Sequence, residues 1–179
     1  MSNNNLTLTT PRLTLRPMCM DYLKSTHEYA ADPENTTYML FLPNDSLDDT
    51  IGYIKEAEEE IKKDDPSFYE MAIFYEDIHI GAVSIYLDED RASAEFGWIM
   101  NKRYHGKGFA TEAAKALLDY AINIIGIKHF IAHCDSENTA SKRVMEKLGF
   151  VLKDEYGGRK NKQSDEDRRE CLYEYDAKV

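Results

Sequence analysis

The chain has 179 residues, of which 31% are charged and 42% are hydrophobic. This length and balance predict one globular domain over residues 1–179, with a flexible start at residues 1–10. The 22 basic and 33 acidic residues give a net charge of −11, and there is no basic stripe, which argues against a nucleic-acid partner. An acidic protein favours cationic partners, although solubility alone would explain the charge.

Targeting signals and metal-binding patterns are not found in the sequence. There is no apolar run of about 18 residues and no secretory signal at the N-terminus, so we expect a cytoplasmic protein without membrane contact. Cys19, Cys134 and Cys171 form no CxxC pair and fit reduced thiols. Cys134 lies in an apolar run and is expected to be a buried structural thiol. His129 and His133 share a strand face without a third ligand nearby, so no metal is expected.

The N-terminal third combines one strand with two helices. Residues 12–16 alternate between two prolines and predict a strand at a sheet edge. Helices are predicted at residues 21–31 and at residues 46–63, the second with Ser46 as its N-cap. Residues 36–44 between them are expected to be irregular. The acidic residues 58–60 could bind a cationic acceptor, but a solvated helix face is the commoner explanation.

Three strands are predicted in the middle of the chain. Residues 68–75 and 78–87 form a hairpin with Glu76 and Asp77 at its turn. Residues 93–100 form the third strand, in which Glu95, Gly97 and Ile99 share one face. Since a glycine inside a strand often marks a bulge or a close approach by a ligand, Gly97 is a candidate for either.

Residues 101–121 place two glycines and several basic side chains before an amphipathic helix. From Ala110 onward, apolar residues recur at three- and four-residue spacing, and Gly126 is a typical helix terminator. The loop of residues 105–108, His-Gly-Lys-Gly, therefore lies at a helix N-terminus, where free amides and the helix dipole bind phosphate. Its glycine spacing matches neither a dinucleotide fingerprint nor a P-loop.

The last third begins with a strand at residues 127–134, parallel to residues 93–100 and reached by a βαβ crossover. Asn138 is the expected N-cap of a short helix that ends at Gly149. Two final strands are predicted at residues 150–155 and 170–175. The polar segment 156–169 between them is expected to be a mobile loop that does not pack.

Two of these segments resemble motifs of the GNAT superfamily of acyl-CoA N-acyltransferases. Residues 105–110, HGKGFA, are similar to motif A, [Q/R]xxGx[G/A], with His105 where Gln or Arg is usual. Residues 138–150, NTASKRVMEKLGF, resemble motif B, and in particular the branch of the ribosomal-protein N-terminal acetyltransferases RimJ and RimL. The motifs have the expected order and separation, and the predicted elements extend the resemblance over nearly the whole chain.

The resemblance implies a GNAT fold of the α/β (α+β) class. Such a fold has a mixed, mostly antiparallel, twisted sheet of about six or seven strands flanked by about four helices. Strand 93–100 would carry a bulge and splay from strand 127–134, and the pantetheine arm would insert between them. The family uses acetyl-CoA as co-substrate, needs no metal, and transfers the acyl group directly to a primary amine in a ternary complex.

The resemblance also implies the cofactor-binding residues. The phosphates would bind the loop at residues 105–111, mostly through main-chain amides, and the pantetheine arm would contact strand 93–100 and the motif B helix. The candidates are Trp98, Ile99, Arg103, His105, Gly106, Lys107, Gly108, Ala110, Thr111, Asn138 and Ser141. For Asn138 and Ser141, helix capping is an alternative explanation.

Two residues are candidates for proton transfer. Glu95 is the candidate general base, because family members often place a glutamate on this strand; water, or a merely solvent-facing Glu95, is the alternative. Ser141 is the candidate donor to the departing thiolate, because Met145 stands where many members have a tyrosine and cannot donate a proton. Tyr156 or water would be next in line.

The acceptor is left open by the sequence. The RimJ and RimL resemblance favours a protein N-terminal α-amino group, as on a ribosomal protein. The alternatives are a small-molecule amine, such as a polyamine or an antibiotic, and a non-catalytic acyl-CoA-binding sensor. Homodimers are frequent in the family, so a homodimer is a further open alternative.

Overall fold

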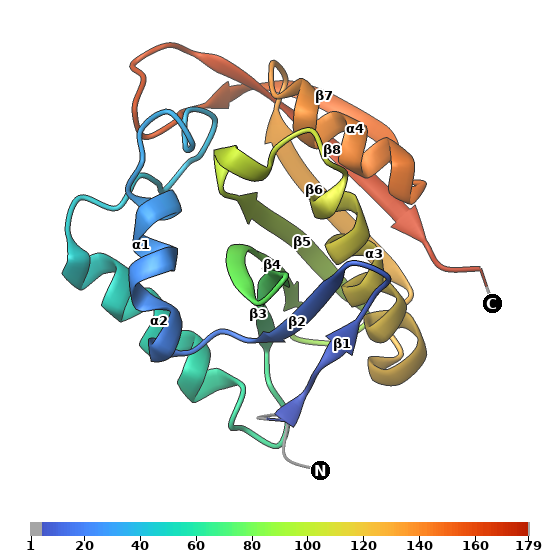
Figure 1. Cartoon of the computed structure of the whole chain (residues 1–179). Helices are drawn as coiled ribbons and strands as arrows, with labels where there is room; N and C mark the ends of the chain where they lie inside the picture. Colours follow the sequence, from blue (N-terminus) through green and yellow to red (C-terminus); the bar gives the residue numbers. More distant parts are fainter. Residues whose placement is uncertain (1–4, 179) are drawn as a thin grey trace.

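The computed structural model of the protein describes residues 5–178 (Figure 1). Its eight-stranded sheet has the order β1-β2-β3-β4-β5-β6-β8-β7. The strands are β1 (Leu8–Thr9), β2 (Leu13–Pro17), β3 (Phe68–Tyr75), β4 (Ile78–Leu87), β5 (Ser93–Met100), β6 (His129–Asp135), β7 (Val151–Arg159) and β8 (Arg168–Asp176). The α-helices are α1 (Leu23–Ala30), α2 (Leu47–Glu60), α3 (Phe109–Tyr120) and α4 (Thr139–Leu148).

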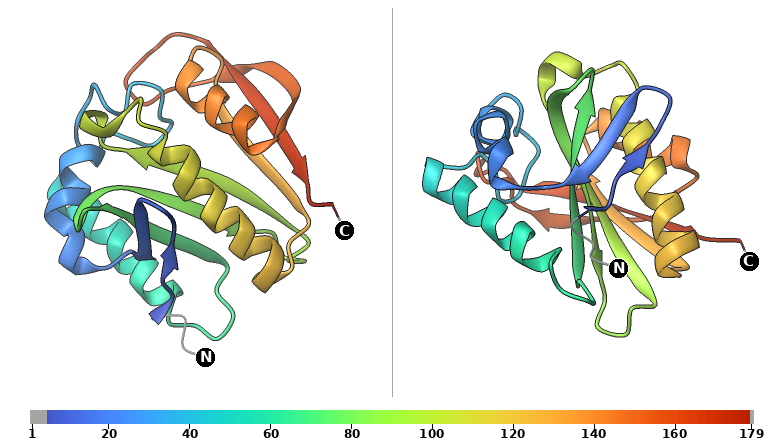
Figure 2. Two further views of the ribbon diagram at one scale, coloured as in Figure 1. Left: turned by 45° about the vertical axis from the view of Figure 1, so that its right-hand side comes forward. Right: turned by 60° about the horizontal axis from the view of Figure 1, so that its bottom comes forward.

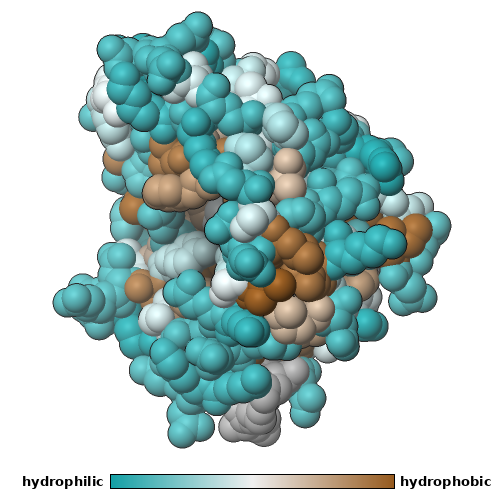
Figure 3. Space-filling model, turned by 90° about the vertical axis from the view of Figure 1, so that its left-hand side faces the viewer, coloured by the Kyte–Doolittle hydropathy of each residue, from teal (hydrophilic) through white to brown (hydrophobic). Residues whose placement is uncertain are grey.

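The helices form a layer on each face of the sheet, as Figure 2 shows edge-on. Helices α1 and α2 pack on β4 and β3, whereas α3 and α4 pack on the other face over β2, β4, β5 and β6. The α1 and α2 side is largely hydrophilic at its surface, with apolar patches between the hydrophilic side chains (Figure 3). The mixed α/β fold predicted from the sequence is confirmed, with one more strand than the upper estimate.

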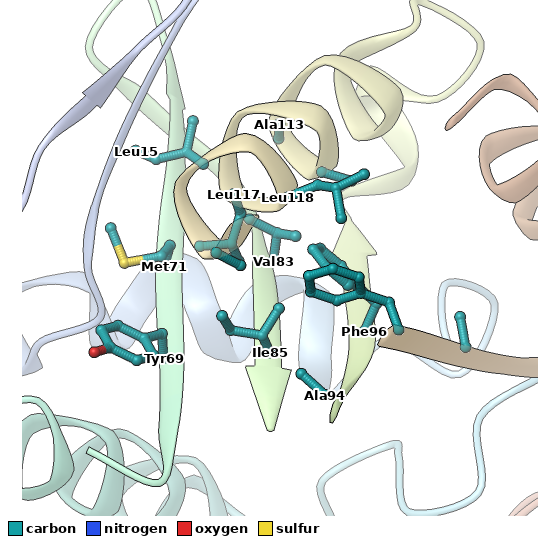
Figure 4. Close-up of a cluster of buried hydrophobic side chains, with 14 of the residues drawn as sticks. Leu15, Tyr69, Met71, Val83, Ile85, Ala94, Phe96, Ala113, Leu117 and Leu118 are labelled. Carbon is teal, nitrogen blue, oxygen red and sulfur yellow. The ribbon is translucent and has the colours of Figure 1, made fainter. Parts of the chain in front are cut away.

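The larger hydrophobic core lies between α3 and the sheet. Leu117 and Leu118 of α3 pack toward Val83, Ile85 and Phe96 of β4 and β5 (Figure 4), and all five are at least 97% buried. Burying a side chain of this size contributes about 1.5–3 kcal/mol. Because alternate strand residues point to opposite faces, this burial fixes the register that also determines which residues face α1 and α2.

Two predicted helix ends, the cap at Ser46 and the stop at Gly126, are confirmed. Ser46 caps α2, and its hydroxyl accepts a hydrogen bond from the Asp49 amide at 3.2 Å while the Asp49 carboxylate accepts one from the Ser46 amide at 2.9 Å. Helix α3 continues as a π-helical turn at Ala121–Ile125, and Gly126 ends it with a φ of 92°. The Glu76–Asp77 hairpin turn is also confirmed, because both residues have positive φ.

Two predictions about strands need correction. Residues 12–16 do not form the sheet edge, because β1 pairs with the outer side of β2, Leu8 opposite Leu15; a two-residue strand has no detectable pattern. Of the predicted flexible start, residues 1–4 lie outside the described residues. Strand β5 has no bulge at Gly97, since its register with β4 is continuous from Leu87 opposite Ala94 to Gly81 opposite Met100.

The polar segment 156–169 was expected not to pack, and this expectation is wrong. Strand β7 extends to Arg159, and the side chains of Arg159 and Asn161 are buried. Beyond β7, the Lys162 amide donates to the Met39 carbonyl at 3.0 Å, and the Lys162 ammonium donates to the Pro43 carbonyl at 2.7 Å. Residues 159–163 therefore dock on the irregular segment 33–45. The partners of Lys162 are more than a hundred residues away, where local composition cannot indicate them.

Candidate active site

The two parallel strands β5 and β6 diverge, and this divergence positions the site. They pair only from Ser93 opposite His129 to Phe96 opposite Ala132, so the second half of β5 has no partner on that side. The predicted splay is therefore confirmed. Two cavities, each of about 520 Å³, adjoin here. The residues they share are Tyr38, Met39, Trp98, Ile99, Asn138 and Ser141.

The first cavity, here called the loop cavity, lies between the loop that precedes α3 and helix α4. Gly106 and Gly108 adopt φ angles of 74° and 78°, a region that favours glycine. The first main-chain hydrogen bond of α3 runs from the Glu112 amide to the Gly108 carbonyl, at 3.0 Å. The amides of Phe109, Ala110 and Thr111 precede it and have no acceptor within the helix. The loop cavity thus offers main-chain donors and a positive helix end to a phosphate group.

The loop is held by the turn between β1 and β2. The Arg12 guanidinium pairs with Glu112 at 2.7 Å, donates to the Lys107 carbonyl at 3.0 Å, and lies over the Phe109 ring at 4.6 Å. The Thr10 hydroxyl also donates to Glu112, at 2.6 Å. These contacts clamp both ends of the loop, and no local sequence signal indicated them.

Nine of the eleven predicted cofactor-binding residues line the loop cavity. They are Trp98, Ile99, His105, Gly106, Gly108, Ala110, Thr111, Asn138 and Ser141. Arg103 and Lys107 do not line it: Arg103 pairs with Glu28 at 2.9 Å, and the Lys107 ammonium lies over the Tyr104 ring at 5.3 Å. The His105 imidazole hydrogen-bonds the Met100 carbonyl at 2.8 Å, and its main-chain amide donates to the Lys102 carbonyl at 3.2 Å.

The cationic side chains of the loop cavity come from α4 instead. Arg143 and Lys147 line it, one helical turn apart. Neither Arg143 nor Lys147 is among the eleven cofactor-binding residues predicted from the sequence. A second phosphate group or another anion could pair with these two residues.

Asn138 and Ser141 lie at the junction of the cavities. The side-chain oxygen of Asn138, Oδ1, accepts a hydrogen bond from the Ser141 amide at 3.1 Å, so the predicted N-cap is confirmed. Both residues line both cavities. Met145 is buried in the core, and Tyr156 is on β7, where it lines neither cavity. Ser141 is thus the predicted proton donor whose position fits.

The second cavity, here called the acid cavity, lies on the α1 and α2 face of the sheet. Glu70 of β3 lines it and is buried. Burial raises the pKa of its carboxyl to about 7, although the hydroxyls of Tyr53, Tyr86 and Ser84 favour the charged form. The Tyr86 hydroxyl donates to Glu70 at 3.3 Å. Sequence reasoning missed Glu70, yet a single acidic residue inside an apolar strand was the available signal.

Glu95 pairs with His133 in the same cavity. Their Oε1 and Nδ1 atoms are 2.8 Å apart, and the side chains are 47% and 23% exposed. This hydrogen bond raises the pKa of His133 above its ordinary value, against the lowering effect of burial. His133 was considered only as a metal ligand from the sequence. The pair is accessible from the cavity and can accept a proton.

The wall of the acid cavity includes an ion pair from the docked segment. The Arg159 guanidinium lies 3.3 Å from Glu170 and donates to the Tyr38 carbonyl at 2.7 Å, which holds Tyr38 at the junction. Burial raises the pKa of Cys134, which also lines the cavity, to about 12, so its thiol is not a nucleophile at neutral pH. More acidic than basic side chains line the acid cavity: Glu70, Glu95 and Glu170 against Arg159 and His133. This excess suits a cationic ligand.

Within residues 5–178, no group of three or more His, Cys, Asp or Glu side chains is arranged to hold a metal ion. No helix in that range is long and apolar enough to cross a membrane.

The chain is similar to known proteins in sequence and in fold. The family of acetyltransferase (GNAT) domains matches residues 12–151. An uncharacterized N-acetyltransferase of Bacillus subtilis, YnaD, is 30% identical over 145 residues, which cover 80% of this chain and 81% of that protein. An acetyltransferase (GNAT family) from Bacillus anthracis has a TM-score of 0.80 and 25% identity, covering 96% of this chain and 98% of the other.

A further solved structure shares the fold at lower identity. It is RimL, a ribosomal L7/L12 alpha-N-protein acetyltransferase, in complex with coenzyme A. Its TM-score is 0.81 and its identity 16%, over 96% of this chain and 98% of that chain.

Proposed function

Because this chain belongs to the GNAT family of N-acetyltransferases, we propose that it transfers the acetyl group of acetyl-CoA to a primary amine that enters the acid cavity. The observation that carries this assignment is the junction of the two cavities. A phosphate-binding helix start on one side meets a carboxylate-lined cavity on the other, at Asn138 and Ser141. Only such a junction lets a phosphorylated donor and a cationic acceptor meet.

Acetyl-CoA fits the loop cavity. Its diphosphate would accept hydrogen bonds from the main-chain amides between Gly106 and Thr111, and its adenosine phosphate would pair with Arg143 and Lys147. The pantetheine arm would lie against Trp98 and Ile99, on the side of β5 where pairing with β6 has ended. The thioester then lies at the junction.

The residues at the junction support direct transfer. The acceptor ammonium loses a proton to the Glu95–His133 pair, and the neutral nitrogen attacks the thioester carbon. A C–N bond forms and the C–S bond breaks, while a β5 amide between Gly97 and Ile99 stabilises the oxyanion. The Ser141 hydroxyl donates a proton to the departing thiolate and regains one from the attacking nitrogen, which loses its second proton as the amide forms. The products are the N-acetylated amine and CoA.

For the acceptor, we propose a protein N-terminal α-amino group. The RimJ and RimL resemblance of the motif B segment and the shared fold with RimL support this choice. A small-molecule amine is the second candidate, because a cavity of about 520 Å³ lies within the size range of small-ligand sites. Release of CoA thiol with peptides of varied first residues, or with free amines, separates the two candidates.

The first test is calorimetric titration with acetyl-CoA. Wild type should bind it, and Gly108→Glu should not, because a carboxylate at the helix start repels phosphate and a side chain at this φ is strained. Gly52→Glu is the matched control, since Gly52 of α2 is exposed and has no atom within 4 Å of an added Cβ. Equal binding by both variants would refute the assignment of the loop cavity. Absence of thiol release with every amine would refute the catalytic assignment.

A further inference from the structure

Glu70 lies too far from the junction to contact the reacting nitrogen. In the sheet register, Glu70 of β3 is opposite Ser84 of β4, which is opposite Gly97 of β5. Two strand spacings separate Glu70 from β5, or roughly 10 Å. The thioester lies beyond β5, where β5 and β6 diverge. A proton acceptor beside the nitrogen is already present in Glu95, so Glu70 has no role in the proposed transfer.

The surroundings of Glu70 form a site of their own. The rings of Tyr29, Tyr53 and Tyr86 line the same end of the acid cavity. The hydroxyls of Tyr53 and Tyr86 interact with the carboxylate, whereas the buried hydroxyl of Tyr29 has no hydrogen-bond partner among the described residues. Among residues 5–178, no cationic side chain lines this end, and Arg159 of the acid cavity pairs with Glu170. A buried carboxylate without a cationic partner lowers the stability of a fold when it is charged. A cationic ligand would supply the missing partner.

We infer that the acceptor carries a second positive charge, an alkylammonium or guanidinium group that binds Glu70 while the primary amine reacts beside Glu95. A carboxylate edged by aromatic rings suits such a cation, because the ring faces attract positive charge and the carboxylate forms a charge-assisted hydrogen bond with it. This inference rests on the proposed function and specifies its acceptor. In an extended conformation, the acceptor would reach across the sheet from β5 to Glu70 on β3.

The same chemistry could come from two sources. A free diamine carries both charges on one alkyl chain. A protein N-terminus carries them when its first residue is lysine or arginine. The acceptor series below contains one matched pair for each source.

The test compares acceptors that differ only in the second charge. Cadaverine and aminopentanol form the first pair, and peptides beginning with lysine or norleucine form the second. We expect wild type to have a kcat/KM roughly tenfold to hundredfold higher for the dicationic member of at least one pair. In Glu70→Gln this ratio should fall toward one, whereas Glu89→Gln, at an exposed position between β4 and β5, should keep it. Glu70→Asp, which retains the charge, should keep part of it.

The outcomes separate this inference from the proposed function. If wild type releases CoA thiol but both pairs give ratios near one, the second cation site is refuted and the enzyme assignment stands. A ratio that is high in wild type and unchanged in Glu70→Gln also refutes the role of Glu70. If no amine releases thiol, the proposed function itself fails. A thermal melt of each variant shows that it is folded before its ratio is used.

Discussion

The substitution Glu70→Gln should stabilise the protein at alkaline pH. Glu70 is 6% exposed, and burial raises its pKa from 4.5 to about 7. The folded protein therefore holds this proton more tightly than the unfolded chain does. Its stability is favoured below pH 4.5 and is lost progressively as the pH rises to 7, where the buried carboxyl becomes charged. Glutamine stays neutral and avoids this loss.

The expected magnitude follows from the two pKa values. Each pH unit between 4.5 and about 7 is worth about 1.4 kcal/mol, so the variant should gain about 3 kcal/mol at pH 8. Below pH 4.5 the two proteins should be equally stable. For a chain of this size, a gain of about 3 kcal/mol raises Tm by roughly 10 °C.

Urea denaturation at pH 5, 6, 7 and 8 measures this difference. The free energy of unfolding of Glu70→Gln minus that of wild type should grow between pH 5 and 7 and then stay constant. Glu59→Gln, at an exposed position, should show no such trend. If Glu70→Gln is equally or less stable than wild type at pH 8, the charged form of Glu70 does not destabilise the fold. The argument that Glu70 needs a cationic ligand would then fail.

Three further predictions concern transfer and the loop. Glu95→Gln should lower kcat on the order of a hundredfold at neutral pH, with the affinity for acetyl-CoA unchanged. The acidic limb of its pH–rate profile should move to lower pH, because the Glu95 hydrogen bond that raises the pKa of His133 is lost. Unchanged turnover would exclude Glu95 from the mechanism. Ser141→Ala should lower kcat with little change in acetyl-CoA binding, and a wild-type rate would mean that the thiolate takes its proton elsewhere. Arg12→Ala should weaken acetyl-CoA binding several-fold by calorimetry, because an exposed ion pair contributes up to about 1 kcal/mol, whereas Lys115→Ala, which breaks the exposed pair with Asp119, should bind like wild type.

Several elements could be predicted from the sequence because their causes are local. The Ser46 cap, the helix end at Gly126 and the loop before α3 depend on residues within a few positions of one another. The φ angles of Gly106 and Gly108 follow the same logic. The strands of the β3–β4 hairpin and β5 also match their predicted bounds, since alternation and turn residues lie within each segment.

Other features could not be predicted because their causes are distant in sequence. Arg159 was assigned to an unpacked loop, yet its partner Tyr38 is 121 residues away. The bulge expected at Gly97 is absent, because the continuous ladder with β4 decides the strand geometry. Glu112 of α3 anchors Thr10 and Arg12, which lie 102 and 100 residues away.

The sequence by itself therefore determined the fold class, the glycine-rich helix start that we propose to bind phosphate and the capped helix of motif B, each through short-range periodicity, capping and glycine geometry. Only the tertiary structure decided the acceptor side. Glu70, Glu95 and His133 come from three strands, and they meet because the sheet register, set by burial of the opposite faces, points all three toward α1 and α2. Local pattern fixes what an element is, whereas the partners of a buried charge depend on which distant strands pack beside it.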